Sequence, residues 1–94
     1  MKIPRRERWK IYGDMLSVLS KQPMSEKIVL TKIQVQVNVP FNRFKEYISE
    51  LKELGLIQSE INLTLTEKGK EYLAEYRKIL KFMKRMGIMS LTYQ

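Results

Sequence analysis

The stretch LKELGLIQSEINLTLTEKGKEYL, Leu51 to Leu73, predicts the end of one helix, a short hairpin and the start of another helix. Leu51 and Leu54 occupy the last apolar positions of the first of these helices. Gly55 comes next, and glycine is the residue that most often takes the left-handed conformation just beyond a helix. The first helix is therefore expected to end at Leu54.

The hairpin and the second helix follow directly. Two short apolar runs, Leu56-Ile57 and Leu63 to Leu65, flank Ser59 to Asn62 in the manner of two strands joined by a turn. Thr66 can cap the next helix with its hydroxyl, and Glu67 places negative charge at the positive end of the helix dipole. These local signals agree with one another, and such agreement is what specifies a fold.

The helix that ends at Leu54 is expected to begin at Pro40, because proline suits the first turn, where its missing N–H would have no partner. Its apolar residues share one face, which should be buried: Phe44, Tyr47, Ile48, Leu51 and Leu54. The remaining positions should be exposed: Asn42, Arg43, Lys45, Glu46, Ser49 and Glu50. This would be the recognition helix of a DNA-binding fold.

An earlier helix is predicted from Arg6 to Lys21, because its apolar residues recur at helical spacing. They are Trp9, Tyr12, Met15, Leu16 and Leu19. Gly13 lies in mid-helix and weakens the helical pattern slightly, and Gln22-Pro23 ends it.

Residues 31–39 allow two interpretations. Ile33, Val35, Val37 and Val39 alternate strictly with polar residues, a pattern typical of a half-buried strand. The order of the surrounding elements favours a helix of about two turns capped by Thr31. In that helix Leu30, Ile33 and Val37 would face the core, and residues 25–29 would form an extended connection able to pair with the hairpin.

The last helix is predicted from Glu67 to Met86, with Gly87 ending it and the apolar tail 88–94 packing onto the protein. Apolar residues recur along it at intervals of four and three: Tyr72, Tyr76, Ile79, Met83 and Met86. Such a seam is typical of a helix that pairs with another helix. A 20-residue helix is about 30 Å long, longer than a small head needs, so we expect a second copy to cover the seam. The alternative is that the helix packs back on its own domain.

The composition excludes several classes of function. A chain of 94 residues forms one structural domain, with a head at 1–66 and a helix with its tail at 67–94. Without cysteine or histidine it lacks the usual general base and the usual transition-metal ligands, so neither an enzyme, a metal site nor a cofactor is expected. No small-molecule effector is indicated. No apolar run is long enough for a membrane span and no leader pattern is present, so a cytoplasmic protein is expected.

The net charge of +8 is concentrated at two places. Residues 1–10 carry five basic residues and one acidic, residues 77–85 carry five basic residues and no acidic one, and the rest of the chain is close to neutral. Clustered positive charge on a small domain is typical of a protein that binds nucleic acid. The alternative is a solvated surface that only aids solubility.

The predicted fold is mainly α with a small β wing, a winged helix-turn-helix followed by a long dimerisation helix. The chain resembles the small archaeal winged-helix DNA-binding proteins that dimerise through a C-terminal antiparallel coiled coil. The resemblance rests on Thr31-Lys32-Ile33, Asn38, the block from Tyr47 to Ile57 and Leu65 to Lys70, and it spans residues 6–86. It implies a homodimer that binds double-stranded DNA as a transcriptional regulator or a nucleoid-associated chromatin protein. The sequence departs from the family in a longer Gln22–Leu30 connection and in Pro40, where a capping serine is usual.

The N-terminal part of a recognition helix makes most base contacts in helix-turn-helix proteins. Asn42 and Arg43 are therefore the candidates for readout, with Lys45, Glu46 and Ser49 beside them. The expected phosphate contacts are Arg5, Arg6, Arg8 and Lys10, together with Lys27 and Lys32. Trp9 is expected in the core or a dimer contact rather than on a base.

The wing tip, Ser59 to Asn62, has no basic residue, and the recognition helix also carries Glu46, Glu50 and Glu53. These features leave a second hypothesis open, a winged helix that binds another protein within a transcription assembly.

Overall fold

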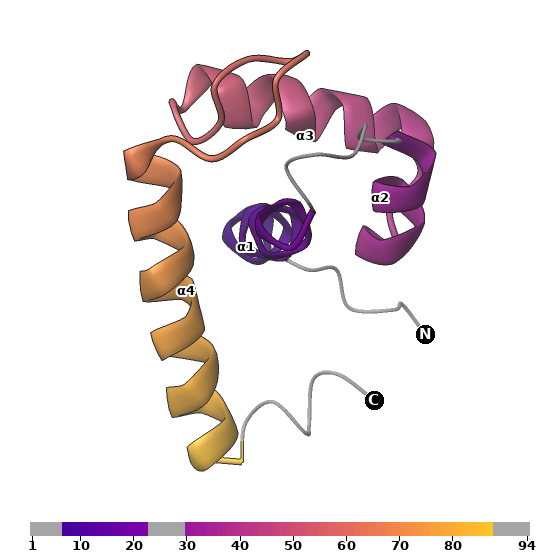
Figure 1. The fold of residues 1–94 in the computed structure, drawn as a ribbon. Helices are drawn as coiled ribbons and strands as arrows, with labels where there is room; N and C mark the ends of the chain where they lie inside the picture. The colour runs from indigo at the N-terminus through magenta and orange to yellow at the C-terminus, as the bar shows by residue number, and fades with distance from the viewer. Residues whose placement is uncertain (1–6, 23–29, 88–94) are drawn as a thin grey trace.

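The structure, a computed structural model, describes residues 7–22 and 30–87, and this part of the chain forms four helices. They are α1 (Arg8–Ser20), α2 (Leu30–Val37), α3 (Phe41–Glu53) and α4 (Glu67–Arg85). Figure 1 shows α3 across one end of the molecule, α1 and α2 beneath it, and α4 running down the side and beyond the other helices. The mainly helical class is confirmed. The predictions for Arg5, Arg6, Lys27, residues 25–29 and the tail 88–94 concern positions outside the described residues.

The core lies where α1 meets the other three helices and the hairpin. Four side chains are completely inaccessible in its centre, Met15 and Leu16 of α1 and Phe44 and Leu51 of α3. The other elements and the rest of α3 add buried apolar residues to the same cluster: Ile33, Val37, Ile48, Leu56, Ile57, Leu63 and Leu73. The helices are short, so their stability comes from burying these faces together rather than from helix propensity.

Residues 30–37 form a helix, which confirms the favoured interpretation over the strand. Ile33 and Val37, four residues apart, are 1% and 2% exposed, whereas Val35 between them is 68% exposed. Two predicted details were wrong. The helix begins at Leu30, so Thr31 lies inside it rather than at its cap, and Leu30 is exposed instead of facing the core.

The turn from α2 to α3 contains Asn38 in the left-handed conformation, with φ of 64°. Pro40 is the N-cap residue of α3 rather than a member of its first turn, because its ψ of 148° is extended. The buried stripe of α3 is confirmed at Phe44, Tyr47, Ile48 and Leu51. Leu54 does not extend it, since it is the C-cap residue and is 44% exposed.

The end of α3 has the predicted glycine geometry. Gly55 has φ of +78°, its N–H donates to the carbonyl of Lys52 at 3.0 Å, and the N–H of Leu56 donates to the carbonyl of Leu51 at 2.9 Å. These two hydrogen bonds form a Schellman motif, which satisfies carbonyls that the helix leaves without partners. The chain therefore turns sharply into the hairpin.

Thr66 caps α4 as predicted, accepting a hydrogen bond from the N–H of Gly69 at 3.0 Å. Its hydroxyl also donates to the carbonyl of Gly55, which ties the start of α4 to the end of α3. Among the described residues the hairpin is held by a single antiparallel bridge, between Ile57 and Leu65. Gly69 then passes so close to the hairpin that a Cβ there would lie 2.0 Å from the carbonyl oxygen of Leu56. The hairpin thus joins α3 to α4.

The first half of α4 packs against α1. Tyr76 is 4% exposed, and its ring meets that of Trp9 edge to face at a centroid distance of 5.9 Å. Its hydroxyl donates to the Asp14 carboxylate at 2.6 Å, and the hydroxyl of Tyr72 donates to the carbonyl of Trp9 at 2.8 Å. The first half of α4 therefore packs on its own domain, which was the alternative to pairing with a second copy. Tyr76 is a core residue of its own chain, whereas the sequence analysis predicted that it would contact a second copy.

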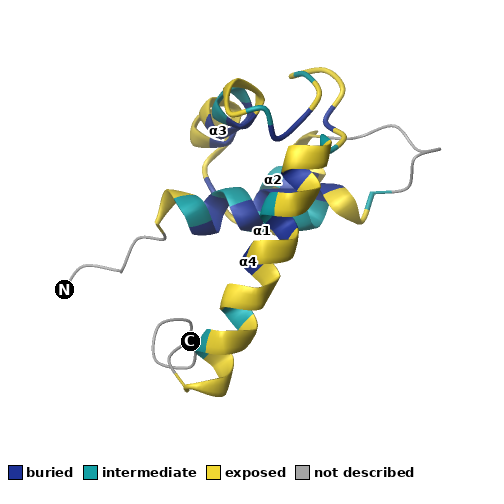
Figure 2. Cartoon of the chain, turned by 90° about the vertical axis from the view of Figure 1, so that its left-hand side faces the viewer, coloured by how far each residue is buried: buried dark blue, intermediate teal, exposed yellow. Residues whose placement is uncertain are grey.

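The second half of α4 extends away from the head and is exposed around most of its circumference (Figure 2). Gly87 follows it with φ of +81°, as predicted for the residue that ends the helix. No helix in the described part of the chain combines the length and the apolar character that a membrane span requires.

Candidate nucleic-acid interface

The outer face of α3 carries most of the residues predicted to contact DNA. Asn42, Arg43, Lys45 and Glu46 are exposed, and Ser49 is half-buried. An α-helix turns roughly 100° per residue, so Lys45, Ser49, Asn42 and Glu46 share one continuous arc opposite the core. Arg43 falls outside this arc, on the flank next to Glu50. The structure therefore brings four of the five residues together and separates Arg43 from them.

An aromatic side chain that the sequence analysis did not select lies at the edge of this arc. Phe41, the first residue of α3, is 44% exposed, and the Lys45 ammonium lies 5.9 Å from the centre of its ring. The ring also stacks on that of Phe44 with a centroid distance of 6.4 Å. The apolar stripe made Phe44 easy to predict as buried. Phe41 lies three residues earlier and just off that stripe. This position beside the stripe was the feature of the sequence that could have identified it.

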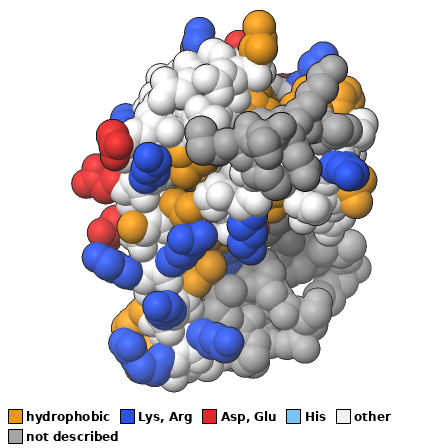
Figure 3. Space-filling view, viewed as in Figure 1, with side chains coloured by type: hydrophobic (Ala, Val, Ile, Leu, Met, Phe, Trp, Pro, Cys, Tyr) orange, Lys and Arg blue, Asp and Glu red, His pale blue; other side chains and the backbone are white. Residues whose placement is uncertain are grey.

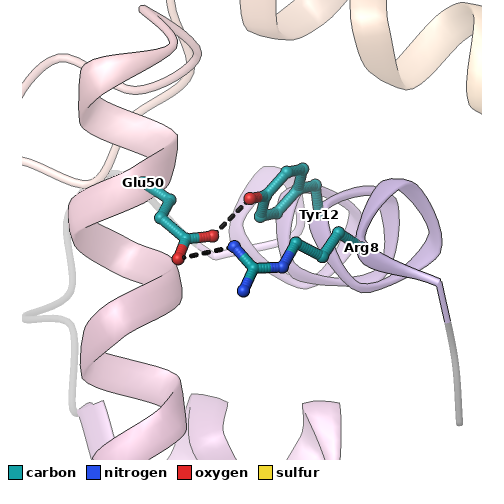
Figure 4. A network of polar contacts seen from close by, with 3 residues as sticks. All are labelled: Arg8, Tyr12 and Glu50. Carbon is teal, nitrogen blue, oxygen red and sulfur yellow. Dashed lines mark hydrogen bonds and ion pairs between the residues drawn. The ribbon is translucent and has the colours of Figure 1, made fainter.

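Arg8 is engaged by α3 instead of being a free cation. Its Nη1 lies 2.9 Å from Oε2 of Glu50, and the other oxygen of that carboxylate accepts a hydrogen bond from the Tyr12 hydroxyl (Figure 4). The Tyr12 hydroxyl and the Glu50 charge together raise the pKa of Arg8 above its ordinary value. Burial raises the pKa of Tyr12 above its ordinary value, and the hydrogen bond to Glu50 adds to this increase. Glu50 had been assigned to the solvent-exposed surface.

The network connects two elements that are far apart in sequence. Arg8 and Tyr12 are one turn apart on α1, and Glu50 lies in the last part of α3. Tyr12 also contacts Tyr47 of α3 edge to face, with 6.3 Å between ring centres. These contacts, together with the shared core, hold α3 against α1.

The other predicted phosphate contacts differ in their exposure. Lys32 of α2 is exposed. Lys10 is 7% exposed, with its ammonium 5.9 Å from the centre of the Trp9 ring, so its assignment as a phosphate partner was wrong. Its long aliphatic stem can be buried along apolar surface, which a charge count does not reveal. Trp9 itself is half-buried against the core, in agreement with the prediction.

The hairpin tip is a hydrogen-bonded turn without positive charge. The Ser59 N–H donates to the carbonyl of Asn62 at 3.0 Å, and the Ser59 hydroxyl accepts from the N–H of Asn62 at 2.8 Å. Ile61 lies at this tip and is 95% exposed, next to the exposed Glu60. The turn therefore presents an apolar side chain and a negative charge to the solvent.

The second half of α4 has two different faces. Its five basic residues are exposed and fall within an arc of roughly 120°: Arg77, Lys78, Lys81, Lys84 and Arg85. Figure 3 shows positive side chains gathered over this part of the molecule. Roughly opposite lies an apolar groove of about 540 Å³. Its walls include Trp9, Leu56, Tyr72, Tyr76, Ile79 and Met83, and we call it the α1–α4 groove.

In residues 7–22 and 30–87, no group of three or more acidic side chains converges in the way that holds a metal ion.

A family model described as winged helix-turn-helix matches residues 5–84 of the chain. No curated protein and no solved structure matched the chain. The matched range begins before α1 and ends one residue before the end of α4, so it includes α1, α2, α3 and the hairpin.

Proposed function

Because this chain belongs to the winged helix-turn-helix family, we propose that it is a DNA-binding protein, a transcriptional regulator or a nucleoid-type architectural protein, that reads duplex DNA with α3. The observation that carries the proposal is the exposed arc on the first turns of α3, with Asn42 and Lys45 on it. We propose a binding protein rather than an enzyme, acting in the cytoplasm on the nucleoid.

The dimensions and chemistry of α3 fit this role. A helix enters the major groove of B-DNA, and the N-terminal residues of a recognition helix contact base edges. Asn42 can pair with adenine through two hydrogen bonds, and Arg43 can do the same with guanine. Lys45 and Lys32 supply positive charge for phosphates on either side of the groove. Arg5 and Arg6 are proposed as further phosphate contacts, whereas Arg8 contributes less while Glu50 neutralises it.

We also propose that the protein is a homodimer and that the α1–α4 groove is where the second copy docks. Ile79 and Met86 are 42% and 54% exposed, although they are large and apolar. Glu71 and Glu75 line the groove beside its apolar walls, whereas the five basic residues lie on the opposite face of α4 and stay outside this interface.

The dimer is tested by light scattering on Met83→Glu, with Lys81→Glu as the control. Met83 lines the groove, whereas Lys81 lies on the opposite face of the same helix. We expect the mass of a dimer for the wild type and for Lys81→Glu, and the mass of a monomer for Met83→Glu. A monomeric wild type, or a Met83→Glu variant that remains dimeric, would contradict this arrangement.

DNA binding is tested by measuring the affinity for a labelled duplex at several salt concentrations. Each neutralised phosphate should contribute about −0.9 to the slope of log K against log salt concentration. We expect Lys45→Ala to reduce both the affinity and the slope. Lys70→Ala removes the same charge from the start of α4, where it pairs with Glu67 at 3.7 Å, and should change little. Absence of binding at low salt, or binding insensitive to salt, would refute the proposal.

The hairpin favours a second candidate, a module that binds another protein in a transcription assembly. Ile61 is 95% exposed beside Glu60 on a turn held by hydrogen bonds, and an exposed apolar residue next to an acidic one suits a protein surface better than DNA. This candidate predicts that Ile61→Ser abolishes capture of the partner and leaves the affinity for DNA unchanged.

A further inference from the structure

Phe41 is a large apolar side chain at a position where a DNA-reading helix meets the bases. It is the first residue of α3, it is 44% exposed, and Asn42 follows it. Phe44, three residues later, is completely buried. The side chain of Phe41 therefore remains on the surface although an apolar core lies within one helical turn of it.

Two contacts hold the ring in place. It stacks on Phe44, with an angle of 29° between the ring planes, and the Lys45 ammonium lies 5.9 Å from its centre. Phe41 and Lys45 are four residues apart and lie roughly 40° from each other around α3, on the side where Asn42 also lies. The ring is thus an exposed apolar surface supported by Phe44, with the Lys45 ammonium over it and Asn42 further round the same side of the helix.

The major groove offers one apolar group to such a surface, the C5-methyl group of thymine. The same base pair presents N7 and N6 of adenine, which an asparagine can engage through two hydrogen bonds. Phe41 and Asn42 are consecutive, so together they match the two kinds of group on the edge of A·T pairs. Lys45 can reach a phosphate from the same side and bring the ring close to the base edges.

We propose that Phe41 is a specificity-determining residue that contacts the C5-methyl group of a thymine, next to an adenine contacted by Asn42. The inference rests on the proposed insertion of α3 into the major groove and adds the class of base pair that it selects. Burying one methyl group contributes about 0.8 kcal/mol, which corresponds to a ratio in affinity of about four.

The test compares a duplex selected from a random pool with the same duplex in which every thymine is replaced by deoxyuridine. This replacement removes only the methyl groups and keeps every hydrogen-bonding group. The wild type should bind the thymine duplex about fourfold more tightly for each contacted methyl group. Phe41→Ala should bind both duplexes equally. The ratio is measured within each variant, so a general loss of affinity does not affect it.

Phe82→Ala is the matched control, because Phe82 is also an exposed phenylalanine, 50% exposed, with a cation, Arg85, 5.6 Å from its ring centre. It lies on α4, so this variant should keep the wild-type ratio. A wild-type ratio of one, or the wild-type ratio in Phe41→Ala, would overturn the inference. Neither result would contradict DNA binding by α3. Failure of the wild type to bind either duplex would refute the proposed function itself.

Discussion

The ring of Tyr76 lies directly against the backbone of Gly13, so that a Cβ added to Gly13 would lie 2.4 Å from the Cγ atom of that ring. Tyr76 is 4% exposed and its hydroxyl donates to Asp14, so the ring is held on both sides. The glycine lets α1 and α4 approach closely. The mid-helix glycine that weakened the sequence pattern is therefore required by packing.

Gly13→Ala should destabilise the protein, although alanine favours a helix by roughly 1 kcal/mol over glycine. Overpacking in a core costs about 1–3 kcal/mol, and the propensity gain offsets about 1 kcal/mol of it, so we expect a net loss of up to about 2 kcal/mol. Urea denaturation measures this free energy of unfolding. Ala74→Gly, at an exposed position on α4, is the control and should show the ordinary cost of glycine in a helix. Increased stability of Gly13→Ala would contradict the packing.

Gly69→Ala should be more harmful, because its Cβ would lie 2.0 Å from the backbone oxygen of Leu56, and backbone yields less readily than a side chain. We expect a loss of about 3 kcal/mol, at the upper end of the overpacking range. Lys70→Ala, one residue later and exposed, should leave stability nearly unchanged. Equal midpoints for the two variants in thermal unfolding would show that the hairpin does not constrain the start of α4.

Glu50→Gln should increase the affinity for DNA, because it releases Arg8 from its ion pair at 2.9 Å and removes a negative charge from α3. Exposed ion pairs contribute up to about 1 kcal/mol, so we expect an increase of about two- to fivefold. The salt dependence should become steeper if Arg8 then reaches a phosphate.

Glu53→Gln is the control for Glu50→Gln. It removes the same charge from an exposed position of α3 and leaves the pair of Arg8 and Glu50 intact. The released arginine should make the effect of Glu50→Gln larger than that of Glu53→Gln. Equal effects in a fluorescence anisotropy titration would mean that only the net charge of α3 matters.

Tyr12 should titrate above the ordinary tyrosine value of about 10, because burial and its bond to Glu50 favour the neutral phenol. Because the pKa of Tyr12 is raised in the folded state, the contribution of this phenol to stability is complete below pH ~10. That contribution is lost as the pH rises through the higher folded value. Absorbance of tyrosinate at alkaline pH measures this directly. Compared with the wild type, Tyr12→Phe should lack absorbance that appears at the high-pH end of the titration. If the missing absorbance belonged to the low-pH end, the raised pKa of Tyr12 would be contradicted.

The elements that were predicted correctly depend on interactions between near neighbours in the sequence. Gly55 ends α3 and Thr66 caps α4 through hydrogen bonds that span a few residues, and the residue types needed for them are few. The errors at the helix boundaries are displacements of one residue. Thr31 is inside α2, and Pro40 is outside α3, because either residue is compatible with both positions.

The candidate site was predictable in part. Exposure of Asn42, Lys45 and Glu46 follows from the period of the apolar stripe on α3. The partner of Arg8 was not predictable, since Glu50 lies 42 residues away and the orientation of α1 on α3 determines the contact. Lys10 was misassigned because the formal charge of a lysine does not show where its aliphatic stem lies.

The sequence by itself determined the end of α3 at Gly55, the start of α4 at Thr66 and the apolar face of α3, because short-range periodicity and capping govern these properties. Only the tertiary structure decided how the faces are used. It placed Tyr76 on Gly13 in the core, bound Arg8 to Glu50 and left Phe41 exposed beside Asn42. The physical reason is that these contacts depend on the distances and angles between helices, which no local pattern contains.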